Sequence, residues 1–96
     1  MVTEFAEIEI IPGKEQDFIA GVEANRAVFT RAAGCHGAEL HRSIEAPQHF
    51  VLNVRWDSID AHGNFWSSPD SHAWRGNISA YFAGAPKVWH SETVMS

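Results

Sequence analysis

Apolar and polar residues alternate over residues 2–11, the first part of the chain. Ala6 and Ile8 take every second position there, and Glu7 and Glu9 occupy the positions that follow them. A period of two is typical of a β-strand whose two faces meet different surroundings. A Pro-Gly pair comes next and favours a turn. The pattern therefore predicts a first strand over residues 2–11.

The apolar period changes to three and four residues over residues 14–33, which is the period of an amphipathic helix. The apolar positions that show it are Phe18, Ile19, Val22 and Phe29. Charged residues lie on the rest of the surface, and Gly34 follows as a typical residue for the end of a helix. We therefore expect one helix over residues 14–33.

Two strand-like runs, residues 36–45 and 49–56, come next with a short turn at Ala46 and Pro47 between them, which indicates a hairpin. The period of two returns near the end of the chain, over residues 87–95. We expect a final strand there.

Two shorter helices are predicted between the hairpin and the final strand. Asp57 or Ser58 is a typical N-cap for a helix over residues 59–66. A Ser-Pro pair, with the proline at the first helical position, begins another helix that runs to about Phe82.

The predicted order is β-α-β-β-α(α)-β, which is the α+β, ferredoxin-like arrangement with a four-stranded antiparallel sheet. We expect one domain over residues 1–96. Right-handed crossovers place both helical segments on one face of the sheet and leave the other face bare. A bare sheet face on a small domain is usually covered by a second copy, so we expect a homodimer that packs sheet to sheet.

Composition narrows the classes of partner. The chain has 96 residues, 45% hydrophobic and 20% charged, with a net charge of −5 and only seven scattered Lys and Arg residues. That balance is typical of a folded globular protein and argues against nucleic-acid binding. No apolar run approaches the roughly 20 residues that cross a bilayer, and the first residues are acidic, unlike a secretory signal. We expect a cytoplasmic protein that binds neither nucleic acid nor membrane.

Cysteine and histidine usage gives no metal signature. Cys35 is the only cysteine, which excludes an intrachain disulfide. It lies in a Gly-rich turn, where we expect a small turn residue; the alternative is a reactive thiol. His36 and His41 are five residues apart, and His62 and His72 are separated by a helix break. Neither spacing is typical of a zinc site, so no metal is expected.

Residues 56–75 hold three of the four tryptophans, and this density suggests the wall of a ligand pocket. His62 shares a helix side with Phe65 and Trp66 and would supply a proton acceptor. The alternative for His62 is a buried ring bonded to a backbone carbonyl. Arg75 would supply a fixed positive charge for an anion, or else form a surface or dimer salt bridge.

Four further residues are candidates for substrate contact, each with an alternative. Trp74 lies at helical spacing with other apolar residues and is most simply core. Trp56 would pack at the sheet edge or stack on substrate, and Asn53 would face the pocket or the dimer interface. Tyr81 would place its hydroxyl at the pocket mouth or in solvent.

Several motifs together resemble the antibiotic biosynthesis monooxygenase domain, of the dimeric α/β-barrel superfamily. They are Trp56-Asp57-Ser58, Ala61-His62, Phe65, Ser68-Pro69-Asp70, Trp74-Arg75 and the exit from Phe82 to Pro86. The resemblance extends over nearly the whole chain and implies the ferredoxin-like fold. The family includes cofactor-independent oxygenases of anthrones and quinols, haem-degrading enzymes, and members without an assigned activity.

Residues that define two branches of that family differ here. Haem-degrading members use an Asn, a Trp and a haem-ligating His at positions that hold Ala6, Phe65 and Arg75 in this chain, so haem degradation is disfavoured. Anthrone oxygenases carry an Asn and a Trp four residues apart. Here Asn53 and Trp56 are three apart, on opposite faces of a strand, so that catalytic pair does not carry over.

The resemblance implies a monooxygenase with neither metal nor flavin that oxidises a small phenol, quinol or anthrone-like substrate with dioxygen. His62 would act as the base, and Arg75 would stabilise the developing anion. The alternative is a non-catalytic dimeric ligand-binding or interaction domain. A closed core filled by Trp56, Phe65 and Trp74 would favour the alternative, and an open cavity lined by His62 and another polar group would favour the enzyme.

Overall fold

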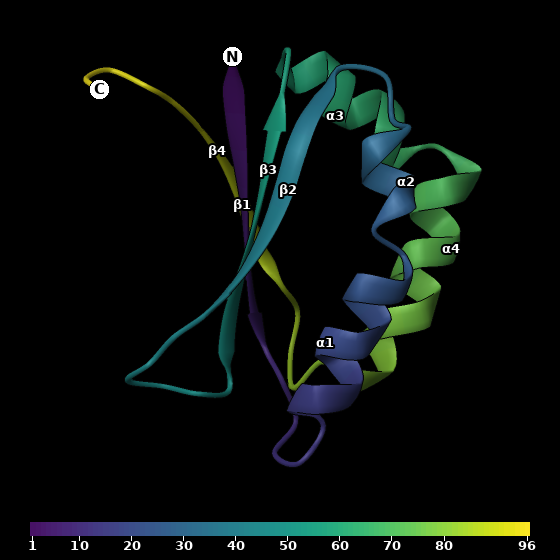
Figure 1. Ribbon diagram of the computed structural model, residues 1–96, viewed down its shortest axis with the longest axis vertical. Coiled ribbons are helices and arrows are strands. Elements are labelled where there is room, and N and C mark those ends of the chain that lie inside the picture. The colour runs from purple at the N-terminus through teal and green to yellow at the C-terminus, as the bar shows by residue number, and fades with distance from the viewer.

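Four antiparallel strands form one sheet with helices against one of its faces (Figure 1). The computed structural model describes residues 1–96. The strands are β1 (Val2–Glu9), β2 (Cys35–Arg42), β3 (His49–Trp56) and β4 (Lys87–Glu92), in the spatial order β2-β3-β1-β4. The helices are α1 (Glu15–Ala24), α2 (Ala27–Thr30), α3 (Ile59–Trp66) and α4 (Pro69–Ile78), followed by a 3₁₀ turn, η1 (Ser79–Tyr81). The predicted α+β, ferredoxin-like fold is confirmed. None of the helices is long and apolar enough to cross a membrane.

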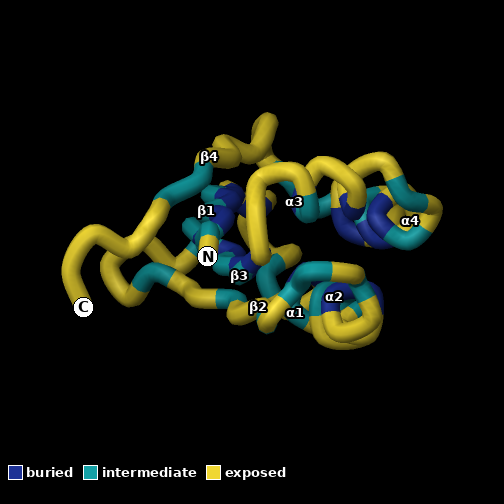
Figure 2. The backbone as a smooth tube through the Cα atoms, turned by 90° about the horizontal axis from the view of Figure 1, so that it is seen from above, coloured by how far each residue is buried: buried dark blue, intermediate teal, exposed yellow.

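β1 lies in the middle of the sheet, between β3 and β4, and its register decides which side chains meet the helices. Ala6 is paired with Leu52 on one side and with Val88 on the other. Because side chains alternate between faces, Glu4 shares the helix side with Ala6, and Phe5 lies on the opposite face. No helix covers that opposite face (Figures 1 and 2).

The hydrophobic core fills the space between the sheet and the helices, where the buried segments meet (Figure 2). Phe18 of α1 packs edge-on against Phe50 of β3, with ring centroids 5.1 Å apart. Phe29 of α2 lies 5.2 Å from Phe65 and 5.0 Å from Trp74. These aromatic contacts join all four helices to the sheet or to each other, and burial of their area is the main stabilising term.

The helix expected over residues 14–33 is wrong as one element, because it breaks at Asn25 and Arg26. The Asn25 side chain donates to the carbonyl of Gly21 at 2.8 Å and accepts from Asn77 of α4 at 3.1 Å. An asparagine that bonds to nearby backbone competes with the helical pattern. The backbone N–H groups of Asn25 and Arg26 donate to the carbonyls three residues earlier, those of Val22 and Glu23, instead of four residues earlier as in an α-helix.

Several predicted elements are shorter than expected. The final strand stops at Glu92 rather than residue 95, since Glu92 pairs with Val2, the first residue of β1. The second strand stops at Arg42, and α4 stops at Ile78 before η1. β1 ends at Glu9, with one isolated bridge beyond it.

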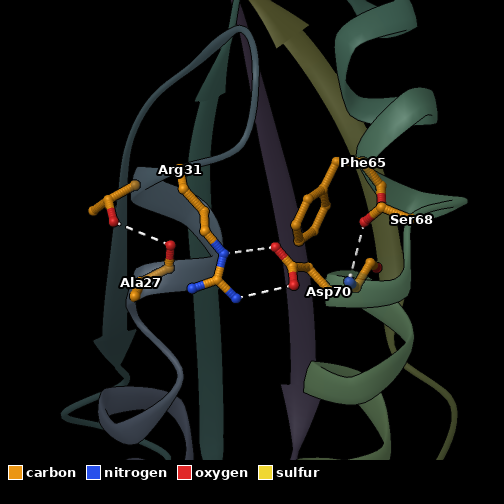
Figure 3. Close-up of polar contacts among 7 residues, drawn as sticks. Ala27, Arg31, Phe65, Ser68 and Asp70 are labelled. Atoms are coloured by element: carbon orange, nitrogen blue, oxygen red, sulfur yellow. Dashed lines mark hydrogen bonds and ion pairs between the residues drawn. The ribbon is translucent and has the colours of Figure 1, made fainter.

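Serine caps fix where α3 and α4 begin. The Ser58 hydroxyl accepts from the backbone N–H of Ala61 at 3.1 Å, and Ser68 does the same for Ser71 at 3.2 Å (Figure 3). Arg31, at the end of α2, forms two hydrogen bonds to Asp70, at 2.7 and 2.9 Å. This contact holds the pKa of the Asp70 carboxyl below its usual range and joins α2 to the start of α4.

Candidate functional site

A cavity of about 270 Å³ lies between the sheet and α4, on the side of the edge strand β4. Its walls are mainly apolar, and the indoles of Trp66 and Trp74 supply aromatic surface. Glu4 and Arg75 are the only charged residues that line it. A mainly apolar space with a few polar groups is the usual form of a small-molecule site.

Glu4 is a buried carboxyl on the wall of this cavity, with 7% of its surface exposed. The indole N–H of Trp56 donates to its Oε1 at 3.0 Å. The Nε2 atom of His62 lies 3.2 Å from the same oxygen. Burial raises the pKa of the Glu4 carboxyl, and the hydrogen bond from Trp56 opposes that effect in part. Glu4 is therefore a stronger base than an exposed carboxylate.

His62 lies behind Glu4, on α3, and is itself buried. Its ring stacks on Trp56, with centroids 5.3 Å apart, and its Nδ1 atom lies 2.7 Å from Nε2 of His90 on β4. Burial lowers the pKa of His62 to about 4, and the nearby His90 adds to that effect. The ring is therefore neutral near pH 7, with one nitrogen a donor and the other an acceptor.

Arg75 is held in one orientation at the opposite wall of the cavity. One terminal N–H donates to the carbonyl of Trp66 at 2.9 Å, and Nε–H donates to the Ser71 carbonyl and hydroxyl at 3.3 Å. Its guanidinium carbon lies 3.7 Å from the centre of the Trp66 ring. Arg75 forms none of the chain's ion pairs. Its remaining N–H groups leave a fixed positive charge available to an anion.

The structure brings some of the predicted site residues to the cavity and leaves others in the core. Trp66, Trp74 and Arg75 line it. His62 reaches it only through Glu4, and Trp56 and Phe65 are core residues. Tyr81 lies in η1, where its ring is beside Gly21 of α1 rather than in the cavity wall.

Asn53 lies on the other face of the sheet, paired with Phe5 and Glu39. It therefore points away from Trp56, as the odd spacing of the two residues predicts. Its side-chain oxygen is buried without a hydrogen-bond partner. Beside it, Phe5 and Trp89 stack with ring centroids 4.6 Å apart.

Glu4 and His90 are polar site residues that sequence reasoning missed. Glu4 has the same strand parity as Ala6 and Ile8, so the alternation places a glutamate on the apolar side of the first strand. His90 has the same parity as Val88 in the final strand. An ionisable residue on the apolar side of a strand is the signal that identifies Glu4. Both sides of the final strand mix apolar and polar residues, so His90 has no such signal.

Cys35 lies at the start of β2 and is partly buried. Burial raises the pKa of its thiol, which makes the reactive thiolate less available. Cys35 is therefore the first residue of a strand rather than a turn residue, and its raised pKa disfavours a reactive thiol.

Comparisons with known proteins agree with the architecture. The family model described as antibiotic biosynthesis monooxygenase (ABM) matches residues 1–77. A structure from Bordetella bronchiseptica, named provisionally as an antibiotic biosynthesis monooxygenase, is 46% identical, with a TM-score of 0.95 over 98% of this chain and 97% of that one. No curated protein matches the sequence.

More distant structures share the fold. SnoaB, a cofactor-independent oxygenase from Streptomyces nogalater solved as a point mutant, is 17% identical, with a TM-score of 0.86 over 99% of this chain and 94% of that one. A Caulobacter crescentus protein, also named provisionally as an antibiotic biosynthesis monooxygenase, is 21% identical, with a TM-score of 0.86 over 98% and 90%. Because the family model matches residues 1–77 and the Bordetella relative is 46% identical, this chain belongs to the antibiotic biosynthesis monooxygenase family.

Proposed function

We propose that this protein is a cofactor-independent monooxygenase that oxidises a small phenol or quinol with dioxygen in the cavity between the sheet and α4. The observation that carries the proposal is one apolar space that combines aromatic walls, a buried carboxyl and a fixed guanidinium. Trp66 and Trp74 would hold a flat ring, and Arg75 would stabilise its anion. The similarity in fold to a cofactor-independent oxygenase supports this class of reaction.

The size of the cavity favours the smaller substrates of the expected class. An engineered apolar cavity of about 150 Å³ accommodates benzene. The cavity here, at about 270 Å³, has room for a substituted ring or a two-ring compound. Phenols and quinols therefore fit this cavity better than three-ring anthrones do.

The reaction balances without a cofactor. A hydroquinone that loses a proton becomes an electron-rich anion, which transfers one electron to dioxygen. The resulting radical and superoxide combine to form a carbon–oxygen bond. Cleavage of the O–O bond then gives a hydroxyquinone and one molecule of water. The protein needs to bind the ring, accept its proton, stabilise the anion and exclude water.

The test is incubation with a panel of hydroquinones, phenols and anthrones in air and without oxygen, using labelled dioxygen. We expect oxygen-dependent product that carries one labelled oxygen atom per turnover. His62→Ala and Arg75→Ala should each reduce kcat, with the exposed His72→Ala as a control. The absence of oxygen-dependent turnover across the panel would overturn the proposal.

The alternative is a non-catalytic ligand-binding or interaction domain. It expects Trp56, Phe65 and Trp74 to fill a closed core. All three residues are buried in the core, as the alternative expects, but Trp74 also lines an open cavity together with Glu4 and Arg75. His62 does not line that cavity, and Glu4 and Arg75 are the polar groups in its wall. This open cavity favours the enzyme. Binding of panel compounds without turnover would favour the alternative.

A homodimer that packs through the bare sheet face stays part of this proposal. Trp89 and Phe5 form an aromatic stack there, and Trp89 is 44% exposed. An exposed aromatic patch on a face that no helix covers is typical of an interface. Trp89→Asp should shift the mass in solution from dimer to monomer, and a wild-type monomer would contradict the proposal. The cytoplasmic location also stays a prediction.

A further inference from the structure

A continuous line of polar contacts runs from the wall of the cavity to the edge of the sheet. It begins at Glu4 on β1, passes through His62 on α3 at 3.2 Å, and continues to His90 on β4 at 2.7 Å. Glu4 and His62 are buried, whereas His90 is only partly buried and lies on the edge strand. The line therefore joins the cavity to a residue with access to solvent.

We propose that Glu4, His62 and His90 form a proton relay in which Glu4 takes the proton of a phenolic ligand and the two histidines carry it to solvent. Glu4 is the group that touches the ligand, since it lines the cavity and His62 does not. His62 and His90 act through Glu4. The choice of a phenolic ligand rests on the proposed function.

Each transfer in the relay conserves protons and charge. The ligand O–H bond breaks, its electron pair stays on the ligand oxygen, and an O–H bond forms on Glu4. That proton passes to Nε2 of His62, while the proton on Nδ1 of His62 passes to Nε2 of His90. His90 then releases a proton to water. A neutral imidazole can accept at one nitrogen and donate from the other, so His62 stays neutral and ends with its proton on Nε2. A turn of the ring restores the starting arrangement before the next transfer.

The groups around the relay favour this direction of transfer. Trp56 donates to Glu4 and fixes the carboxyl against the His62 ring. Arg75 faces Glu4 across the cavity and would stabilise the ligand anion that remains. The other titratable neighbours are the Cys35 thiol, which lies beside Trp56 on β2, and Glu92, two residues beyond His90 on β4. Neither of them interrupts the line of contacts.

The experiment uses para-nitrophenol, because its anion absorbs visible light and reports ionisation without turnover. Bound to the wild-type protein, the probe should ionise at a pH where the free probe is mainly neutral. Glu4→Gln should reduce the fraction ionised about tenfold, which corresponds to about one pKa unit. Glu7→Gln is the matched control, because it lies on the same strand, faces away and accepts from a tryptophan in the same way. Glu4→Asp provides a second variant that keeps the carboxyl.

The two histidines are tested by the rate of ionisation after a pH jump. His62→Gln and His90→Gln should slow the response of the bound probe on the order of tenfold. Added imidazole should restore the rate in His90→Gln, which a merely structural role does not predict. His72→Gln is the control. Equal rates in all the histidine variants, an effect of Glu4→Gln no larger than that of Glu7→Gln, or no binding of the probe would overturn the relay. Ionisation of the probe together with no oxygen-dependent turnover across the panel of hydroquinones, phenols and anthrones would overturn the oxygenase and leave the relay standing.

Discussion

On each face of β1 a glutamate contacts a tryptophan and a histidine from neighbouring elements, but only one of the two sets is buried. The inner set is Glu4, Trp56 and His62, on the helix side of the sheet. Trp56 donates to Glu4 at 3.0 Å, and His62 lies 3.2 Å from the same oxygen. The side chains of Glu4 and His62 are 9% and 11% exposed.

The outer set is Glu7, Trp89 and His49, on the bare face. Trp89 donates to Glu7, also at 3.0 Å, and His49 lies 3.6 Å from Glu7. The side chains of Glu7 and His49 are 32% and 28% exposed, so water reaches both partners. Water screens the charges of such a pair and weakens its effect on either group.

The two sets have the same residue types and similar contact distances, so burial is what prepares the inner set for acid–base chemistry. Burial raises the pKa of Glu4 and lowers that of His62 to about 4. The carboxyl becomes a better proton acceptor, and the ring stays neutral and can pass a proton on. The alternation of β1 places Glu4 on one face and Glu7 and Glu9 on the other, and the helices bury only the face that carries Glu4.

The largest expected effect is the difference in stability lost when each of the two tryptophans is replaced by alanine. Trp56 is fully buried, so Trp56→Ala should lower the free energy of unfolding by about 3–5 kcal/mol. Trp89→Ala should cost less than about 1 kcal/mol within one protomer, because Trp89 is 44% exposed. Urea unfolding at several protein concentrations measures both and separates folding from association. Equal losses of unfolding free energy within the protomer would show that the inner and outer tryptophans do not differ in burial as described.

The next effect is the pH dependence of stability. Because folding lowers the pKa of His62 from 6.5 to about 4, the stability it contributes is complete above 6.5 and is lost as the pH falls through about 4. The shift corresponds to about 3 kcal/mol. Glu4 acts in the opposite direction, since its raised pKa gives stability that is lost as pH rises. Wild-type protein should therefore lose more stability than His62→Gln between pH 7 and pH 4.

Urea midpoints at a series of pH values measure this difference. Contributions from Glu4 and the surface carboxylates are present in both proteins and largely cancel. His49→Gln is the matched substitution in the outer set. The same acid sensitivity in His62→Gln and His49→Gln would show that the two faces do not differ in this way.

A smaller effect concerns the cap that positions His62. Ser58→Ala removes the hydroxyl that accepts from Ala61 at the start of α3, and should lower the free energy of unfolding by about 1 kcal/mol. Frayed α3 should also let water reach His62, so its pKa should move back toward 6.5. Ser68→Ala, at the start of α4, should cost a similar amount without that change. Thermal unfolding and histidine NMR measure the two effects.

The smallest effect is expected in the outer set itself. Within one protomer, Glu7→Gln should change the free energy of unfolding by no more than about 0.5 kcal/mol, because both partners of the Glu7–Trp89 contact are accessible to water there. Denaturant unfolding is precise enough to test this limit. A loss of several kcal/mol that does not depend on protein concentration would place Glu7 in a contact buried within the protomer and contradict its assignment to the face that no helix covers.

The fold could be predicted from local patterns where tertiary contacts do not override them. The second hairpin strand and α3 occupy residues 49–56 and 59–66, as the alternation and the serine cap predict. The break at Asn25 depends on a hydrogen bond from Asn77, far along the chain. The end of β4 depends on where β1 begins. Neither cause is visible in a local window of sequence.

Some residues of the candidate site could be predicted from a local segment of sequence, and others only from the tertiary structure. Trp66, Trp74 and Arg75 lie within one dense segment, and the sequence alone indicated all three. Glu4 and His90 come from the first and last strands, and the pairing of β1 with β4 brings them together. A sequence pattern shows that Glu4 lies on the apolar side of its strand, but only the sheet order shows that Glu4 and His90 flank His62.

The most direct test of the buried relay is a nitrogen-15 NMR measurement of the His62 ring at pH 6. We expect a neutral His62 ring, with one nitrogen protonated and the other accepting a hydrogen bond, because burial lowers the pKa of His62 to about 4. We also expect that Glu4→Gln shifts the Nε2 signal and that Glu7→Gln does not. A doubly protonated His62 at pH 6, or a spectrum that Glu4→Gln leaves unchanged, would contradict the account.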